Sequence, residues 1–170
     1  MGQHLSLITE HSLPDFQPET WIPFLQSHYH LIDILADLPG AKDANDYRDA
    51  TLRDGEPISY IHLLGPLGAI QIGPSLVYLH SSENYHQFIN IQIVQNIMLK
   101  YCREFAACVG GNALAIMPCD SIGQYASEWI ENDLSFDEFL SQMTEQFGES
   151  THEISSMDFM KNWHVSQIAE

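Results

Sequence analysis

Polar and apolar positions in the first third of the chain predict a strand, a helix and a loop. Residues 3–9, which include Leu5, Leu7 and Ile8, are expected to form a short first strand. A helix is predicted to begin at Pro18 and to stop at Pro39, with Pro23 tolerated only in the first turn, where its missing N–H leaves no helical bond unmade. Residues 40–56 are polar and rich in turn formers, so a surface loop or a frayed helix is expected there.

The hydrophobic pattern then changes to short extended runs. Three β-rich runs, at 58–64, 69–72 and 76–79, are separated by Gly-Pro turns and predict an antiparallel meander. Later in the chain, the fully apolar run at 113–117 predicts a buried central strand.

Residues 83–109 predict a single long amphipathic helix. Their apolar side chains recur at steps of three and four, the spacing that places side chains on one helix face. Ser81 or Ser82 is expected to cap the start of this helix, and the pair Gly110 and Gly111 is expected to end it. The apolar face consists of Phe88, Ile91, Val94, Met98, Cys102, Phe105 and Val109.

The C-terminal third predicts two further helices and a last packed element. Asp120 or Ser121 is expected to cap the first of these helices. Residues 135–138 (SFDE) match a capping box, so the second helix is predicted to start there and to end at Gly148. Residues 151–170 retain several apolar side chains, which favours a last strand or short helix packed on the body.

These elements predict one α+β domain over residues 1–170, because strands and helices are intermixed without a sustained βαβ rhythm. We expect a short antiparallel β-meander packed against several helices, with the long amphipathic helix at about 83–109 in the centre. Composition agrees with a globular chain: 45% of the 170 residues are hydrophobic and 11% are aromatic. No repeat or low-complexity block divides the sequence.

Charge narrows the range of functions. The chain has 23 acidic and 6 basic residues, for a net charge of -17. Proteins that bind nucleic acids directly need Lys and Arg to displace counterions from phosphates, so direct nucleic-acid binding is not expected, and neither is attachment to an anionic membrane. The electric field of such a protein would attract a basic protein partner.

The acidic residues are unevenly distributed. Eleven of them, and no Lys or Arg, lie between Glu104 and Met160. The ordinary interpretation is a solvated helix face, although ordinary surfaces mix the two signs of charge. The predicted partner-binding surface consists of Glu128, Glu131, Asp133, Asp137, Glu138 and Glu145. Tyr125 or Trp129 is a candidate aromatic anchor, and for Trp129 a place in the core is the favoured interpretation.

Signals for catalysis are weak. The nine histidines show no spacing typical of a metal site, although His62 and His80 can approach across the meander, and neither a metal nor a cofactor is expected. Cys119 follows the apolar run 113–117 and precedes a helix, which is a suitable place for a nucleophile but also for a buried thiol. Three unpaired cysteines and the lack of a secretory signal favour a cytoplasmic protein.

In its overall features, the chain resembles the small acidic α+β immunity proteins that bacteria make against their own toxins. The resemblance rests on size, on the acidic C-terminal half and on the lack of catalytic signatures, and it includes no motif specific to a named family. It implies a tight one-to-one complex that covers the active site of a basic toxin. Two alternatives remain: a phage or plasmid inhibitor of host defence that mimics nucleic acid, and a small hydrolase or transferase that uses Cys119.

Overall fold

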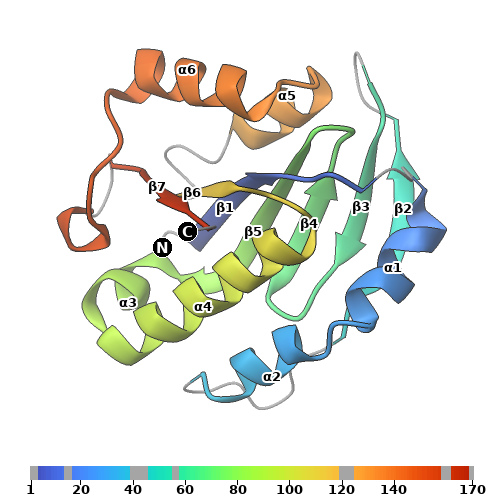
Figure 1. Cartoon of the computed structure of the whole chain (residues 1–170), viewed down its shortest axis with the longest axis horizontal. Coiled ribbons are helices and arrows are strands. Elements are labelled where there is room, and N and C mark those ends of the chain that lie inside the picture. The colour runs from blue at the N-terminus through green and yellow to red at the C-terminus, as the bar shows by residue number, and fades with distance from the viewer. Residues whose placement is uncertain are drawn as a thin grey trace.

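Seven antiparallel strands and helices on both of their faces make up the described part of this computed structural model (Figure 1). The structure describes residues 4–13, 17–38, 46–54, 58–118, 125–157 and 162–168. The strand order in the sheet is β2-β3-β4-β5-β1-β6-β7. The strands are β1 (His4–Glu10), β2 (Arg48–Arg53), β3 (Tyr60–Leu64), β4 (Gly68–Ile72), β5 (Leu76–Asn84), β6 (Ala113–Pro118) and β7 (His164–Gln167). The α-helices are α1 (Pro18–Gln26), α2 (His30–Ala36), α3 (Tyr85–Asn90), α4 (Gln92–Cys108), α5 (Ala126–Glu131) and α6 (Phe136–Phe147), and a 3-10 helix spans Ile154–Ser156.

Strands β1, β5 and β6 are buried on both faces and hold the two sides of the molecule together. Successive side chains of a strand point to opposite faces, so neighbours in the sequence enter different cores. On β1, Leu7 enters one core and Ile8 the other, and Val77 and Tyr78 divide in the same way on β5. This explains why these strands carry continuous apolar runs rather than an alternation with polar residues.

Each face of the sheet has its own helix layer. Helices α1 to α4 cover the first core, and α5 and α6 cover the second, as Figure 1 shows. The expected α+β domain with an antiparallel meander, β3 to β5, is therefore confirmed, as are the first strand and a last strand. The run at 113–117 is the buried strand β6, as expected, but it lies next to the edge strand β7 and not in the centre of the sheet. No helix in the described ranges is long and apolar enough to cross a membrane.

The prediction of a single helix over 83–109 is wrong, because the helix is interrupted at Ile91. This residue has extended dihedral angles (φ −112°, ψ 107°) and separates α3 from α4. Phe88 before the break and Val94 after it still enter the same core, so the apolar spacing continues across a gap in the backbone helix. The helix cap is also shifted: the Asn84 side chain accepts a hydrogen bond from the Gln87 N–H (3.1 Å), whereas Ser81 belongs to β5.

The helix expected from Pro18 to Pro39 is also divided. Helix α1 ends at Gln26 and α2 begins at His30, and Pro23 lies inside α1 rather than in its first turn. A proline at that place cannot bond to the carbonyl one turn earlier, which weakens the helix and favours an early end. Side chains complete that end, because the Ser27 hydroxyl and the His28 Nδ1–H both donate to the Phe24 carbonyl (2.6 and 2.7 Å).

Part of the polar segment expected to be a loop is strand β2, at the edge of the sheet. Its polar sequence fits because five of its six residues are exposed. Pairing with β3 is interrupted by a bulge between Arg48 and Thr51, and Asp49 has a left-handed backbone (φ 57°). Exposure and the bulge remove the alternation by which a strand is recognised.

The capping box at the start of α6 is confirmed. The Ser135 hydroxyl accepts a hydrogen bond from the Glu138 N–H (3.2 Å), and the Glu138 carboxylate accepts one from the Ser135 N–H (2.8 Å). Gly148, with φ 83°, ends the helix as expected. The caps predicted at Asp120 or Ser121 lie outside the described residues.

A buried pair of tyrosine hydroxyls connects the start of β2 to α4. The hydroxyl oxygens of Tyr47 and Tyr101 lie 2.7 Å apart, and neither residue is exposed. Each hydroxyl satisfies the other, because a buried polar group without a partner would be destabilising. Burial also raises the pKa of both phenols, so both stay neutral at physiological pH.

We expect Tyr101→Phe to lower the free energy of unfolding by about 1 to 3 kcal/mol, because it leaves the Tyr47 hydroxyl buried without a partner. The double variant Tyr47→Phe/Tyr101→Phe should lose less than the sum of the two single losses, since no orphaned hydroxyl remains. Urea unfolding of the four proteins measures this coupling. Strictly additive losses would show that the two hydroxyls do not depend on each other.

Candidate functional site

Of the six acidic residues predicted to bind a partner, Asp133 lies in the turn between α5 and α6, and the other five lie on these two helices. The inner sides of these helices enter the second core through Trp129 and Ile130 of α5 and Phe139 and Met143 of α6. The opposite sides therefore face away from the sheet. We call the resulting set the acidic surface; its members are Glu128, Glu131, Asp133, Asp137, Glu138 and Glu145.

The acidic surface is open to solvent and carries no compensating base. Five of its side chains are exposed, and that of Glu131 is partly exposed. Residues 125–157 contain no Lys or Arg. Among the described residues, ion pairs join His30 to Glu104 (3.7 Å) and Arg48 to Asp49 (3.8 Å), and none involves the acidic surface. Its carboxylates thus repel one another without a local counter-charge.

Helix stability explains only part of this arrangement. Asp137 and Glu138 lie in the first turn of α6, where the helix dipole favours a negative charge, and Glu138 also completes the capping box. Glu131 and Glu145 lie in the last turns of α5 and α6, where the same dipole disfavours an acid. Neither last turn contains a base. These two glutamates therefore need an explanation other than helix formation.

The two candidate aromatic anchors differ in exposure. Trp129 is 2% exposed and packs edge-on against Phe139, with ring centroids 5.1 Å apart, so it belongs to the core. Tyr125 is 39% exposed and lies beside Trp129 and Phe147, with ring centroids 6.2 and 5.9 Å away. Of the two, Tyr125 is the one that a partner can reach.

A second candidate site, which the sequence did not reveal, is a groove between α2 and α4. It has a volume of about 370 Å³ and continues into a hollow of about 250 Å³ beside α4. Lys100 and Glu104 line both parts, and Asp33 and Asp37 line the α2 side. Only the fold brings α2 and α4 together, so no local spacing in the sequence indicates this groove.

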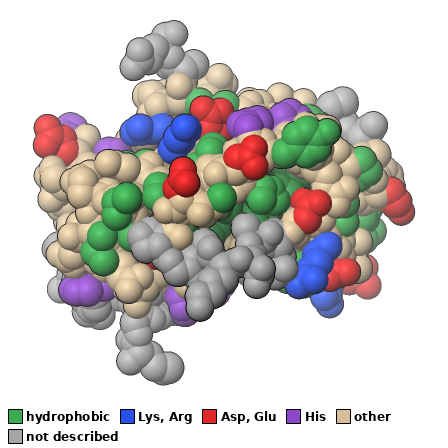
Figure 2. Space-filling view, turned by 90° about the horizontal axis from the view of Figure 1, so that it is seen from below, with side chains coloured by type: hydrophobic (Ala, Val, Ile, Leu, Met, Phe, Trp, Pro, Cys, Tyr) green, Lys and Arg blue, Asp and Glu red, His purple; other side chains and the backbone are tan. Residues whose placement is uncertain are grey.

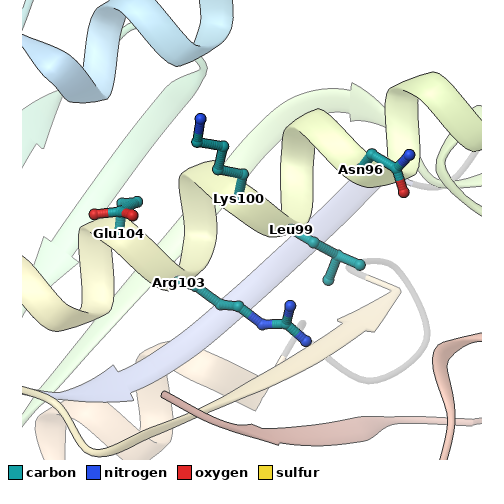
Figure 3. A pocket seen from close by; sticks show the side chains of 5 residues that line it. All are labelled: Asn96, Leu99, Lys100, Arg103 and Glu104. Atoms are coloured by element: carbon teal, nitrogen blue, oxygen red, sulfur yellow. The ribbon is translucent and has the colours of Figure 1, made fainter. Parts of the chain in front are cut away.

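The basic residues of α4 point in different directions (Figure 3). Lys100 extends toward α2, whereas Arg103 extends the other way and donates hydrogen bonds from Nε and Nη2 to the Ser166 hydroxyl (3.2 and 3.0 Å). The groove is therefore open and lined by side chains of both charges. Small-molecule sites are usually enclosed and mostly apolar, so its shape does not favour a small ligand.

The surface around α2 and α4 contrasts with the acidic surface. In the view from below, acidic, basic and histidine side chains are interspersed with apolar ones (Figure 2). Two of the four basic residues within the described ranges, Lys100 and Arg103, lie on α4. The uncompensated acids of α5 and α6 cover the opposite face of the sheet. The two faces of the molecule thus differ in charge: the side of α2 and α4 mixes acids and bases, whereas α5 and α6 carry acids without Lys or Arg.

The described residues offer little for catalysis. Burial raises the pKa of Cys102 to about 12 and that of Cys108 to about 11, so both thiols stay protonated and are poor nucleophiles. Cys119 lies outside the described residues. His62 pairs with Gln71 and His80 with Ala69, so these two histidines are not opposite each other in the sheet. Within the part of the chain that the structure describes, no three His, Cys, Asp or Glu side chains are grouped as a metal ion would require.

Comparison of the chain with protein-family models, with curated proteins and with solved structures finds no match.

We predict that Glu145→Gln raises the free energy of unfolding by about 0.3 to 1 kcal/mol at low salt, because it removes a negative charge from the C-terminal turn of α6. The matched variant Asp137→Asn, in the first turn of the same helix, should lower it by a similar amount. Urea unfolding at low and high salt measures both effects. A stability loss in Glu145→Gln would mean that this carboxylate serves the fold.

Proposed function

We propose that this protein binds a basic protein partner through the acidic surface and thereby neutralises it, most simply as a cytoplasmic immunity protein that covers the active site of a bacterial toxin. The observation that carries this proposal is the set of outward-facing carboxylates on α5 and α6 with no base beside them. Two of them, Glu131 and Glu145, occupy positions that helix stability disfavours.

The physics of the acidic surface favours a basic groove as its target. Like charges held together on two helices destabilise the free protein, and a partner rich in Lys and Arg relieves that repulsion on binding. Enzymes that act on nucleic acids carry such grooves for phosphates. A surface of fixed carboxylates competes for the same groove, so a toxin that attacks nucleic acid is the partner class we infer.

We expect Tyr125 to supply binding energy that the charged residues alone do not. Charged residues at the rim of an interface mainly speed association, whereas buried aromatic anchors contribute most of the binding energy. Tyr125 is partly exposed and is held in place by Trp129 and Phe147, so it needs little ordering when it enters a partner. We therefore place the anchor of the interface at Tyr125 and the steering charges around it.

The test uses co-expression with a candidate toxin, encoded beside this chain, that has a basic C-terminal domain. We expect the native protein to restore growth and to bind the toxin with an association rate that falls steeply with added salt. The variant Glu128→Gln/Glu131→Gln/Glu145→Gln should associate about tenfold more slowly at low salt, because steering rates depend on charge. Stopped-flow fluorescence gives the rates.

The matched control carries the same change in charge elsewhere, as Glu19→Gln/Asp33→Asn/Asp54→Asn. These three residues are exposed and lie on α1, on α2 and after β2, away from the acidic surface. The control should keep most of the native rate. Equal slowing by both triple variants would assign the effect to net charge rather than to the acidic surface, and no rescue of growth would contradict the immunity function.

A further inference from the structure

His11 is held in a defined chemical state at one end of the sheet. It follows β1, and its Nε2 lies 2.8 Å from the carbonyl oxygen of Gly73, in the turn between β4 and β5. A carbonyl oxygen only accepts hydrogen bonds, so Nε2 must carry the hydrogen, and Nδ1 of the neutral ring is then bare. This Nδ1 is buried and has no hydrogen-bond partner among the described residues.

The surroundings of the ring suit a neutral imidazole. The Trp21 ring of α1 stands edge-on to it, with centroids 5.2 Å apart and planes at 83°. Trp21 is 1% exposed, and its indole Nε1 is also buried without a partner. A proton added at Nδ1 would create a buried N–H with no acceptor, which is unfavourable.

One charged group acts on this ring from the described elements packed around it. Asp133, in the turn between α5 and α6, favours the protonated ring. The α1 side contributes the uncharged Trp21, and Glu10 of β1 accepts hydrogen bonds from Asn112 instead. The turn at Gly73 also packs against α5, since a Cβ on Gly73 would lie 3.0 Å from the Ile130 Cγ2.

We propose that His11 is a proton-sensitive latch, whose neutral ring fastens the end of β1 to the β4–β5 turn and to α1, and whose protonation loosens this corner. The bond from Nε2 to Gly73 and the contact with Trp21 hold the closed state. The charged ring would place an N–H at Nδ1 where the closed state offers it no acceptor among the described residues, and this cost outweighs the attraction of Asp133, so acid opens the corner formed by the end of β1, the β4–β5 turn and α1.

The sign of the pH dependence follows from burial. Burial lowers the pKa of His11, and the opposing effects of the Gly73 bond and of Asp133 are smaller. The opened corner therefore binds a proton more readily than the closed one. Stability of the corner is full above the ordinary imidazole pKa of about 6.5 and is lost as the pH falls below it.

The test must report on the corner around His11 alone, because burial also lowers the pKa of His164, which lies in the edge strand β7. Two amides report on the corner: the His11 N–H bonds to the Ser75 carbonyl (3.2 Å), and the Gly73 N–H bonds to the Leu76 carbonyl (2.8 Å). We expect NMR to find the His11 ring in the Nε2–H form at pH 7. Hydrogen-exchange protection of both amides should fall by up to about tenfold per pH unit below 6.5, the limit for one proton.

The variant His11→Gln stays neutral at every pH, so protection of the Gly73 amide should lose its pH dependence. The exposed control His152→Gln should keep it, and the remote Gln95 amide, bonded to the Ile91 carbonyl (3.0 Å), should not follow it in the native protein. If His11→Gln fails to fold, the native protein alone decides. A His11 ring that titrates at or above 6.5, or flat protection of both amides, would overturn the proposal.

Discussion

Burial of the middle strands on both faces is the constraint on which the rest of this structure depends. Because β1, β5 and β6 have apolar side chains pointing both ways, the sheet must be covered twice. Helices α1 to α4 cover one face, and α5 and α6 cover the other. Each covering helix uses one side for the core and leaves its other side to solvent. The positions of charge on the molecule follow from this division.

The two helix layers then differ in the charge that they carry. The layer of α2 and α4 mixes acids, bases and histidines, as ordinary soluble surfaces do. The layer of α5 and α6 carries acids alone, including some at helix ends where they weaken the helix. Residues that oppose the local stability of a fold tend to mark functional sites.

Sequence patterns predicted this protein well where one physical signal dominated. The apolar run at 113–117, the capping box at Ser135 and the outward acids of α5 and α6 each follow from side-chain type and spacing alone. The predictions failed where backbone geometry changed while the pattern continued, as at Ile91, or where solvent exposure removed the pattern, as in β2. The groove between α2 and α4 and the fit around His11 depend on contacts between distant segments, which a single sequence does not encode in any local spacing.

The bulge in β2 has a consequence for how these molecules meet one another. Arg48 pairs with Leu64 of β3, and Arg53 pairs with Tyr60. Arg48 lies three residues before Thr51 and Arg53 two residues after it, but because of the bulge each arginine is two β3 positions away from the partner of Thr51. A second copy that paired with β2 about Thr51 would therefore set Arg48 directly opposite Arg53. Like charges so placed repel, and the left-handed turn at Asp49 interrupts the row of free N–H and C=O groups. The bulge and the two arginines thus disfavour the growth of fibrils from the β2 edge of the sheet.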